Sequence, residues 1–378
     1  MTYRGKTLSS AFAAAAGLVL ASAAPAQAQS SDAMPSFNGT VLTVAYQGDI
    51  AYVGGDFTAA IVNGKPVARA HLAAIDARTG ALLPWQPAAN GRVKSLVVNG
   101  SAIYLAGDFT MVGGQKRDSL ARVHAGTGAV SSTFRHSISG RPLAIAAGSG
   151  RLYLGGTISA VDGQPRGRLA AFDLRTGALD TRWQPTADDQ VEVVTAGGGR
   201  VYAGGKFHRI NSVAGYDRLV ALDPASATIV SGFRPRPPVI TYAIAVTADG
   251  VYSAHGGQGG RISAYTSAGA LRWSATFDGD AQAVTVLGDT VYAGGHFDRA
   301  CSTARTGVQG SCVDGSDNRI KLAALSTADG HLLDWTADAN GVEGVLALAS
   351  NSSLGAVAMG GAFTTVEGRP QKRFAQFS

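Results

Sequence analysis

Two histidines, His208 and His296, are the residues of this sequence best suited to acid–base chemistry. Each stands beside a glycine-rich segment that recurs along the chain, and an imidazole can exchange a proton near neutral pH. With neighbouring acidic residues they would suit a lyase or hydrolase that acts on a carbohydrate or a lactone. The alternative is a structural or surface role, since none of the seven histidines forms the i, i+4 pair of a helical metal site. Catalysis therefore stays open, and the interpretation we favour is a non-enzymatic one.

Charged residues also recur at one position, directly before a phenylalanine and after the glycine-rich segment. Arginines and lysines recur a second time, just before a later strand of the same repeat. Such cations could form a rim that faces an anionic polymer or a sugar acid, because arginine makes paired hydrogen bonds to carboxylate or phosphate. The alternative is ion pairing between neighbouring repeats. The predicted binding residues are Asp56, Asp108, Lys206, His296, Asp298 and Arg319.

The two cysteines, Cys301 and Cys312, predict a disulfide. They stand eleven residues apart, and no thiol or imidazole follows at the short spacing of a metal site. The segment from Asp314 to Asn318 offers oxygen ligands at alternate positions, but it lacks the later glutamate of a calcium loop. We therefore expect no cofactor, with calcium at this segment as the weaker alternative.

These residues belong to a repeat that decides the fold. An aromatic–small–Gly-Gly signature recurs seven times, at intervals of 40 to 66 residues. Strand-rich repeats of this length are typical of propeller blades. The sequence thus predicts an all-β, seven-bladed β-propeller with four-stranded antiparallel blades. The copies of the signature are Tyr52–Gly55, Tyr104–Gly107, Tyr153–Gly156, Tyr202–Gly205, Tyr252–His255, Tyr292–Gly295 and Ala358–Gly361.

Each repeat has the same internal order. A short apolar strand leads through a turn such as Asn99-Gly100 into the strand that carries the signature. A polar loop, a third strand and a turn of the type Asp-x-x-Thr-Gly follow, as at Asp173 to Gly177, where the aspartate side chain is expected to close the turn. The fourth strand ends in an aromatic residue, which we expect to pack between blades. All four tryptophans stand at this position: Trp85, Trp183, Trp273 and Trp335.

The ring must also be closed. The chain ends at Ser378, soon after Phe374, and this leaves no room for a fourth strand in the last blade. We expect residues near Ala33–Phe37 to supply that strand, because pairing the two ends of the chain removes exposed sheet edges.

The first 28 residues predict export. Arg4 and Lys6 precede an apolar run, and Ala26-Gln27-Ala28 forms a small-x-small cleavage site, as in a secretory signal peptide. The expected domains are a signal peptide, residues 1–28, and one propeller, residues 29–378. Since the signal holds two cations and no acid, its removal lowers the formal charge from +6 to +4. The remaining cations are scattered, so we expect no nucleic-acid binding. No later apolar segment is long enough for a membrane span, so we expect none after signal removal. We also expect a monomer.

The phrase Tyr-Val-Gly-Gly-Asp-Phe-Thr from Tyr52, with Leu-Ala-Ala-Ile-Asp-Ala-Arg-Thr-Gly-Ala-Leu-Leu-Pro-Trp from Leu72, resembles the delta-60-type β-propeller repeat of bacterial secreted and surface proteins. The resemblance covers nearly all of residues 40–378. It implies a propeller but no established activity. The combination Asp-x-x-Thr-Gly-x-Leu-x-x-Trp has a looser likeness to quinoprotein-type propellers. Their adjacent cysteine pair is absent here, which argues against a redox cofactor.

The function expected from these observations is binding. An exported or cell-surface propeller would bind a glycan, a cell-envelope polymer or a protein on the face that holds its variable loops. The alternative is the lyase or hydrolase, with its site at the mouth of the channel. An enzyme would need histidine and acidic groups to converge at that mouth.

Overall fold

The computed structural model describes Met1 and residues 34–378. The predicted signal peptide, residues 1–28, therefore lies outside the described residues except for Met1. Among the described residues, no helix has the length and apolar character needed to cross a membrane.

Among the described residues, seven antiparallel sheets repeat one plan, in which a first strand pairs with a second and the second with a third. The first strands are β2 (Val41–Gln47), β7 (Arg92–Asn99), β13 (Pro142–Gly148), β18 (Val191–Gly197), β23 (Ile240–Thr247), β27 (Ala281–Leu287) and β32 (Val345–Asn351). The second strands are β3 (Ile50–Gly55), β8 (Ala102–Asp108), β14 (Arg151–Gly156), β19 (Arg200–Gly205), β24 (Gly250–Gly256), β28 (Thr290–Gly295) and β33 (Ala356–Gly361). The third strands are β6 (Leu72–Asp76), β11 (Leu120–His124), β17 (Leu169–Asp173), β22 (Leu219–Leu222), β25 (Gly260–Tyr265), β31 (Leu322–Ser326) and β36 (Phe374–Phe377).

Short hairpins connect most second strands to the third strands that follow them. They are β4 (Ala59–Val62) with β5 (Lys65–Ala68), β9 (Met111–Val112) with β10 (Gln115–Lys116), β15 (Ala160–Val161) with β16 (Gln164–Pro165), β20 (Arg209–Ile210) with β21 (Val213–Ala214), β29 (Arg299–Cys301) with β30 (Ser316–Asn318), and β34 (Thr365–Val366) with β35 (Arg369–Pro370). The remaining described elements are β1 (Ser36–Phe37), β12 (Ile138–Ser139), β26 (Leu271–Phe277) and the 3-10 helix η1 (Val308–Gly310).

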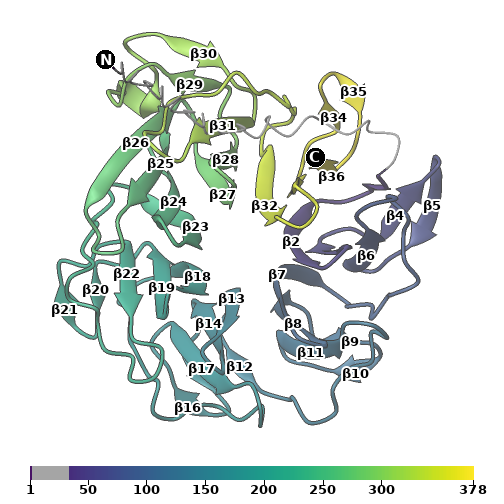
Figure 1. Cartoon of the computed structure of the whole chain (residues 1–378). Helices are drawn as coiled ribbons and strands as arrows, with labels where there is room; N and C mark the ends of the chain where they lie inside the picture. The colour runs from purple at the N-terminus through teal and green to yellow at the C-terminus, as the bar shows by residue number, and fades with distance from the viewer. Residues whose placement is uncertain (2–33) are drawn as a thin grey trace.

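The seven sheets form a closed ring. Each first strand contacts the first strand of the next sheet, and β32 in the last sheet contacts β2 in the first. Figure 1 shows these strands around the central opening, with the hairpins at the outer perimeter. The described chain is thus a β-propeller, the fold class that the repeat predicts.

The glycines of the signature allow this close packing. A Cβ on Gly360 would lie 2.5 Å from Val41 Cγ1, at the junction of the last and first sheets. A Cβ on Gly361 would lie 2.1 Å from the carbonyl oxygen of Gly344 in its own sheet. Only glycine permits both approaches.

The aromatic residues pack as expected, between neighbouring sheets. Within a repeat, the rings of Tyr153 and Trp183 lie 5.0 Å apart, as do those of Tyr52 and Trp85. Trp183 is then buried against Val220 and Leu222 of the next sheet. Trp85 Nε1 donates a hydrogen bond to the carbonyl oxygen of His124 in the next sheet, at 3.1 Å. The prediction that these tryptophans serve packing between repeats is confirmed.

The strand count differs from the four predicted for each blade. In the fifth sheet, β26 pairs along β25, and β29 and β30 then extend the sheet to six strands. The other six sheets of the ring have three strands. In five of them the fourth segment keeps only an isolated bridge, such as Ile75 with Leu82. In the first sheet Pro84, which has no N–H to donate, follows that bridge.

The described part of the N-terminal stretch is placed differently from our prediction. Ser36 and Phe37 form β1, which pairs with β4 beside the first sheet and not with β36 of the last. The N–H of Phe37 nevertheless donates to the carbonyl oxygen of Lys372 at 3.1 Å, so this stretch does link the two ends of the chain. Residues 2–33, which include Ala33, lie outside the described residues.

The connection between the second and third strands of the sixth sheet, which we call the sixth connection, holds the predicted disulfide between Cys301 and Cys312. In the fifth sheet the connection between the second and third strands is short, since β24 ends at Gly256 and β25 begins at Gly260.

Candidate functional site

Every first strand of the ring contains a β-bulge near its beginning. At each bulge one residue is skipped in the pairing with the second strand, as Lys94 is between Val93 and Ser95. A bulge re-aims the side chain that it carries. The seven skipped residues are Leu42, Lys94, Leu143, Glu192, Tyr242, Gln282 and Leu346.

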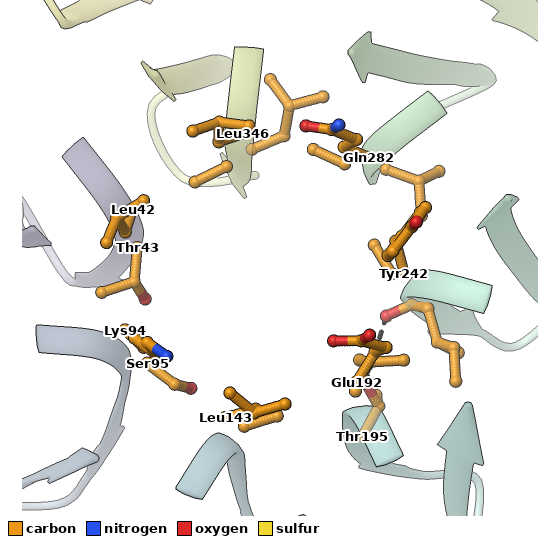
Figure 2. Close-up of a pocket in the computed structure, with 18 of the residues that line it drawn as sticks. Leu42, Thr43, Lys94, Ser95, Leu143, Glu192, Thr195, Tyr242, Gln282 and Leu346 are labelled. Atoms are coloured by element: carbon orange, nitrogen blue, oxygen red, sulfur yellow. Dashed lines mark hydrogen bonds between the residues drawn. The ribbon is translucent and has the colours of Figure 1, made fainter. Parts of the chain in front are cut away.

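All seven skipped residues line one cavity of about 310 Å³ at the centre of the ring. We call this set the bulge ring. All seven side chains are partly exposed. Figure 2 shows them around the central opening, with Lys94 and Glu192 on different sides. The bulge ring contains both apolar and polar side chains: three leucines and a tyrosine, with one cation, one carboxylate and one amide.

A second cavity, of about 430 Å³, adjoins the bulge ring at the first and last sheets. Asp56, Arg92 and Glu343 line it together with Leu42 and Leu346 of the bulge ring. One predicted binding residue, Asp56, therefore lines this second cavity, which lies at the channel mouth.

The predicted residues that precede a phenylalanine pair with charged residues around this mouth. Arg92 Nη2 donates to Asp56 Oδ2 at 2.7 Å. Asp108 Oδ2 forms ion pairs with Lys94 Nζ of the bulge ring, at 3.2 Å, and with Arg141 Nη2, at 3.3 Å. Burial alone would raise the pKa of Asp108, but the hydrogen bonds from Arg141 and Lys94 outweigh burial and lower it.

On the other side of the mouth, the residue before the phenylalanine is the cation and the bulge-ring residue is the carboxylate. Lys206 Nζ lies 3.6 Å from Glu192 Oε1, and Gln190 Nε2 donates to the same carboxylate at 2.5 Å. Tyr242 stands next in the bulge ring. Its pKa is raised by burial first and then by the nearby carboxylates of Asp280 and Glu192, so the phenol stays neutral.

The structure does not bring the two predicted acid–base histidines together. His208 Nδ1 lies 2.9 Å from Asp217 Oδ1 beside hairpin β20–β21, and its side chain is 55% exposed. His296 belongs to a different sheet, with Nδ1 4.0 Å from Asp280 Oδ2. Each histidine thus has one carboxylate neighbour, and the two stand two sheets apart.

Asp298 and Arg319 lie at the sixth connection, and both are engaged within the chain. Lys321 Nζ donates to Asp298 Oδ1 at 2.6 Å and to the carbonyl oxygen of His296 at 3.0 Å. Arg319 donates to the carbonyl oxygens of Asn318 and Leu333, at 2.7 and 2.8 Å. Equivalent arginines brace three other sheets in the same way; they are Arg69, Arg117 and Arg166.

The segment considered for calcium is held by other contacts. Asp314 Oδ2 accepts a hydrogen bond from Thr303 Oγ1 at 2.7 Å, and Arg305 lies 3.4 Å from Oδ1. In the part of the chain that the structure describes, no three His, Cys, Asp or Glu side chains gather as metal ligands would.

The sequence did not identify the bulge ring as a site. Its signal was present, since Lys94 and Glu192 are charged residues at one repeat position inside otherwise apolar strands. Alternation alone would treat that position as one side of a regular strand. A bulge changes the register and so aims the side chain at the channel.

Comparisons with known proteins agree with the ring. A family model described as outer membrane protein assembly factor BamB matches residues 5–231 and 215–366. The crystal structure of the WD40 beta propeller domain of Doa1 is similar at 10% identity with a TM-score of 0.61, covering 93% of this chain and 96% of that one. The computationally designed Ika8 protein is similar at 14% identity with a TM-score of 0.50, covering 91% and 98%. The sequence matches no curated protein.

Proposed function

The chain belongs to the family of the outer membrane protein assembly factor BamB, and from that premise we propose that it is a protein-binding scaffold of the cell envelope. Its partner docks on the channel mouth and inserts an apolar side chain into the bulge ring. The description of the family names the assembly of outer membrane proteins, so the partner is an outer membrane protein chain or a factor that handles one.

The observation that carries this proposal is the composition of the bulge ring. Leu42, Leu143, Leu346 and Tyr242 are partly exposed in the central cavity, where an apolar group from a partner would remove them from water. Burying apolar surface contributes about 25 cal/mol per Å². Protein interfaces concentrate their binding energy in such recessed apolar or aromatic centres.

The charges around the mouth fit the rim of such an interface. Asp56 with Arg92, Asp108 with Lys94, and Lys206 with Glu192 are already paired in the chain. A partner that approaches them meets neither a concentrated positive face nor a negative one. Paired rim charges favour correct orientation more than raw affinity. This balance supports a protein partner over an anionic glycan or envelope polymer, which was the other class expected from the sequence.

Several finer features belong to the same proposal. Each of the seven main sheets is one blade, residues 29–378 form one domain, and the protein acts as a monomer without a cofactor. The disulfide between Cys301 and Cys312 supports export, because disulfides persist in oxidising compartments. We also propose that the repeat is of the delta-60 type, a subtype within the propeller class.

The test is a binding measurement on purified protein. Unfolded outer membrane protein chains, kept soluble in dilute urea and labelled with a fluorophore, are titrated with the wild type and with L42N/L346N. Loss of two apolar contacts in the recess is expected to weaken binding at least tenfold, since truncation of a central contact commonly costs more than 1 kcal/mol. L271N is the matched control, because Leu271 is 60% exposed on β26, outside the channel.

Equal affinities for wild type and L42N/L346N would reject the bulge ring as the docking site. A glycan array probed with the same proteins separates the polymer alternative. If a glycan binds in a way that depends on Leu42 and Leu346, and the protein chains do not bind, the partner is a polymer and not a protein.

A further inference from the structure

A second surface, far from the channel, carries an unusual concentration of arginine. It lies on hairpin β20–β21 and on the segment that follows Phe233, which reads Arg234-Pro235-Arg236-Pro237-Pro238. The corresponding segments after Trp85 and Trp183 carry glutamine and proline but no arginine pair. Figure 1 places β20 and β21 at the outer perimeter of the ring.

Two guanidinium groups converge on one point of this hairpin. A Cβ on Gly215 would lie 2.7 Å from Arg236 Nη2 and 3.3 Å from Arg234 Nη2. Arg236 Nε donates to the carbonyl oxygen of Gly215 at 3.1 Å, and Arg234 lies over the ring of Tyr216, 4.6 Å from its centre. Both side chains are therefore held in place before any ligand arrives.

A third arginine, Arg209, stands beside them on β20. It pairs with Ala214 across the hairpin, and its Nη1 donates to the carbonyl oxygen of Ser212 at 3.3 Å. Among the described residues, none of the three arginines has a carboxylate partner within ion-pair distance. The nearby Asp217 is engaged by His208. Like charges held this close repel each other, and an anion placed against them would relieve the repulsion.

The remaining features of the surface identify the anion. Arginine forms paired hydrogen bonds with phosphate oxygens, and all three arginines are exposed. Val213, 46% exposed, adds an apolar side chain beside the turn. Several cations next to an exposed apolar group suit the boundary of a membrane whose headgroups carry phosphate.

We propose that the arginine surface, formed by Arg209, Arg234 and Arg236 with Val213, binds the phosphate groups of an anionic lipid membrane. The backbone at Arg236 supports this assignment. Its φ of 47° is a conformation that side chains rarely adopt, and it directs Arg236 toward Gly215. Because this surface is remote from the bulge ring, the protein can hold a membrane and a protein partner at the same time.

The experiment is co-sedimentation of the full chain with vesicles. One set contains equal parts of phosphatidylglycerol and phosphatidylcholine, and the other contains phosphatidylcholine alone, both at 100 mM salt. The wild type is expected to bind the anionic set and not the neutral set. R209Q/R234Q/R236Q is expected to lose about 100-fold in affinity, since each cation near an anionic surface contributes about fivefold.

The matched control removes three charges from the tips of other hairpins. K65Q/K116Q/R369Q has the same net charge as the test variant, and its three positions are exposed and without ion pairs among the described residues. It is expected to bind like the wild type. V213S is expected to weaken binding several-fold while all arginines remain. Circular dichroism and the Tm of each variant check that the ring is intact.

Equal loss in both triple variants would show a general charge effect and overturn the proposal. Binding of the wild type to neutral and anionic vesicles alike would overturn it as well. A third arm adds inorganic phosphate or a DNA duplex to the protein without vesicles. Saturable binding of either one at the arginine surface, with no vesicle binding, would replace the membrane by a soluble phosphate ligand or a nucleic acid.

Discussion

Trp183 Nε1 donates a hydrogen bond to the carbonyl oxygen of Asp223, 3.2 Å away in the next sheet of the ring. The indole is fully buried, and its partner Tyr153 reaches the same turn by donating from its hydroxyl to Pro224 at 3.0 Å. The third sheet is thus fixed to the fourth both by burial of the indole against Val220 and Leu222 and by directed hydrogen bonds.

We expect substitution of Trp183 to separate these two contributions. W183A should lower the free energy of unfolding by about 3–5 kcal/mol through loss of the buried ring. W183F keeps an aromatic ring but loses the donor, and the lost hydrogen bond alone should contribute about 1 kcal/mol of its destabilisation. Equilibrium urea unfolding measures both, with L271A at an exposed position as the control. Equal stability of W183A and the wild type would contradict the role assigned to this contact.

The junction that closes the ring gives a second prediction. G360A would place a Cβ 2.5 Å from Val41 Cγ1, so either the last sheet or the first must shift. Overpacking of this kind costs about 1–3 kcal/mol. V41A added to G360A should restore part of that loss, because the smaller side chain makes room. The measurement is the unfolding free energy of both single variants and the double variant, and the pair should be non-additive.

The control for this cycle is G232A. A Cβ on Gly232 meets no atom within 4 Å, and its φ is not in the left-handed region. G232A is therefore expected to keep wild-type stability. Strict additivity of V41A and G360A would show that ring closure does not depend on the contact between them.

The repeat made much of this fold predictable from sequence. The aspartate of the Asp-x-x-Thr-Gly turn acts as expected, since Asp76 Oδ1 accepts hydrogen bonds from the N–H groups of Arg78 and Thr79 at 3.0 and 2.9 Å. The tryptophans and the cysteine pair were also predictable. In each case a local pattern or a fixed position in the repeat carries the information.

Features that depend on register or on distant partners were not predictable in this way. Strand alternation gives no sign that Leu42 or Gln282 is skipped in its pairing, so the bulge ring was missed. The position of Phe37 depends on Lys372 and on β4, which are far apart in sequence. Charge alone also could not show that Arg319 faces the carbonyl oxygens of its own chain.

The disulfide gives a third prediction. The bond between Cys301 and Cys312 closes a short loop, and loop-closure entropy predicts that it contributes about 3 kcal/mol to the free energy of unfolding. C301A/C312A should therefore unfold at lower urea concentration than the oxidised wild type. Dithiothreitol should lower the midpoint of the wild type and leave that of C301A/C312A unchanged. A wild-type midpoint that does not respond to the reductant would contradict the prediction.

The fifth sheet differs from the others by a buried polar group at the end of its second strand. His255 stands where most of the other repeats have the second glycine of the signature, and it is fully buried. Its Nδ1 lies 3.1 Å from Thr241 Oγ1, and its Nε2 lies 2.7 Å from Ser253 Oγ. Burial first, and the charge of Arg261 second, lower the pKa of His255 from 6.5 to about 3.

This shift predicts a loss of stability in mild acid. Between pH 6.5 and about 3 the unfolded chain binds a proton at His255 that the folded chain does not, so the free energy of unfolding falls as pH falls. The slope from this one group approaches about 1.4 kcal/mol per pH unit. Urea unfolding of the wild type and H255Q from pH 7.5 to 4 measures it as the difference between the two proteins. H331Q removes an exposed histidine instead. It should leave in place the part of the pH dependence of the unfolding free energy that comes from His255. Parallel curves for wild type and H255Q would show that His255 takes up its proton equally in both states, which its complete burial beside two hydroxyl groups argues against.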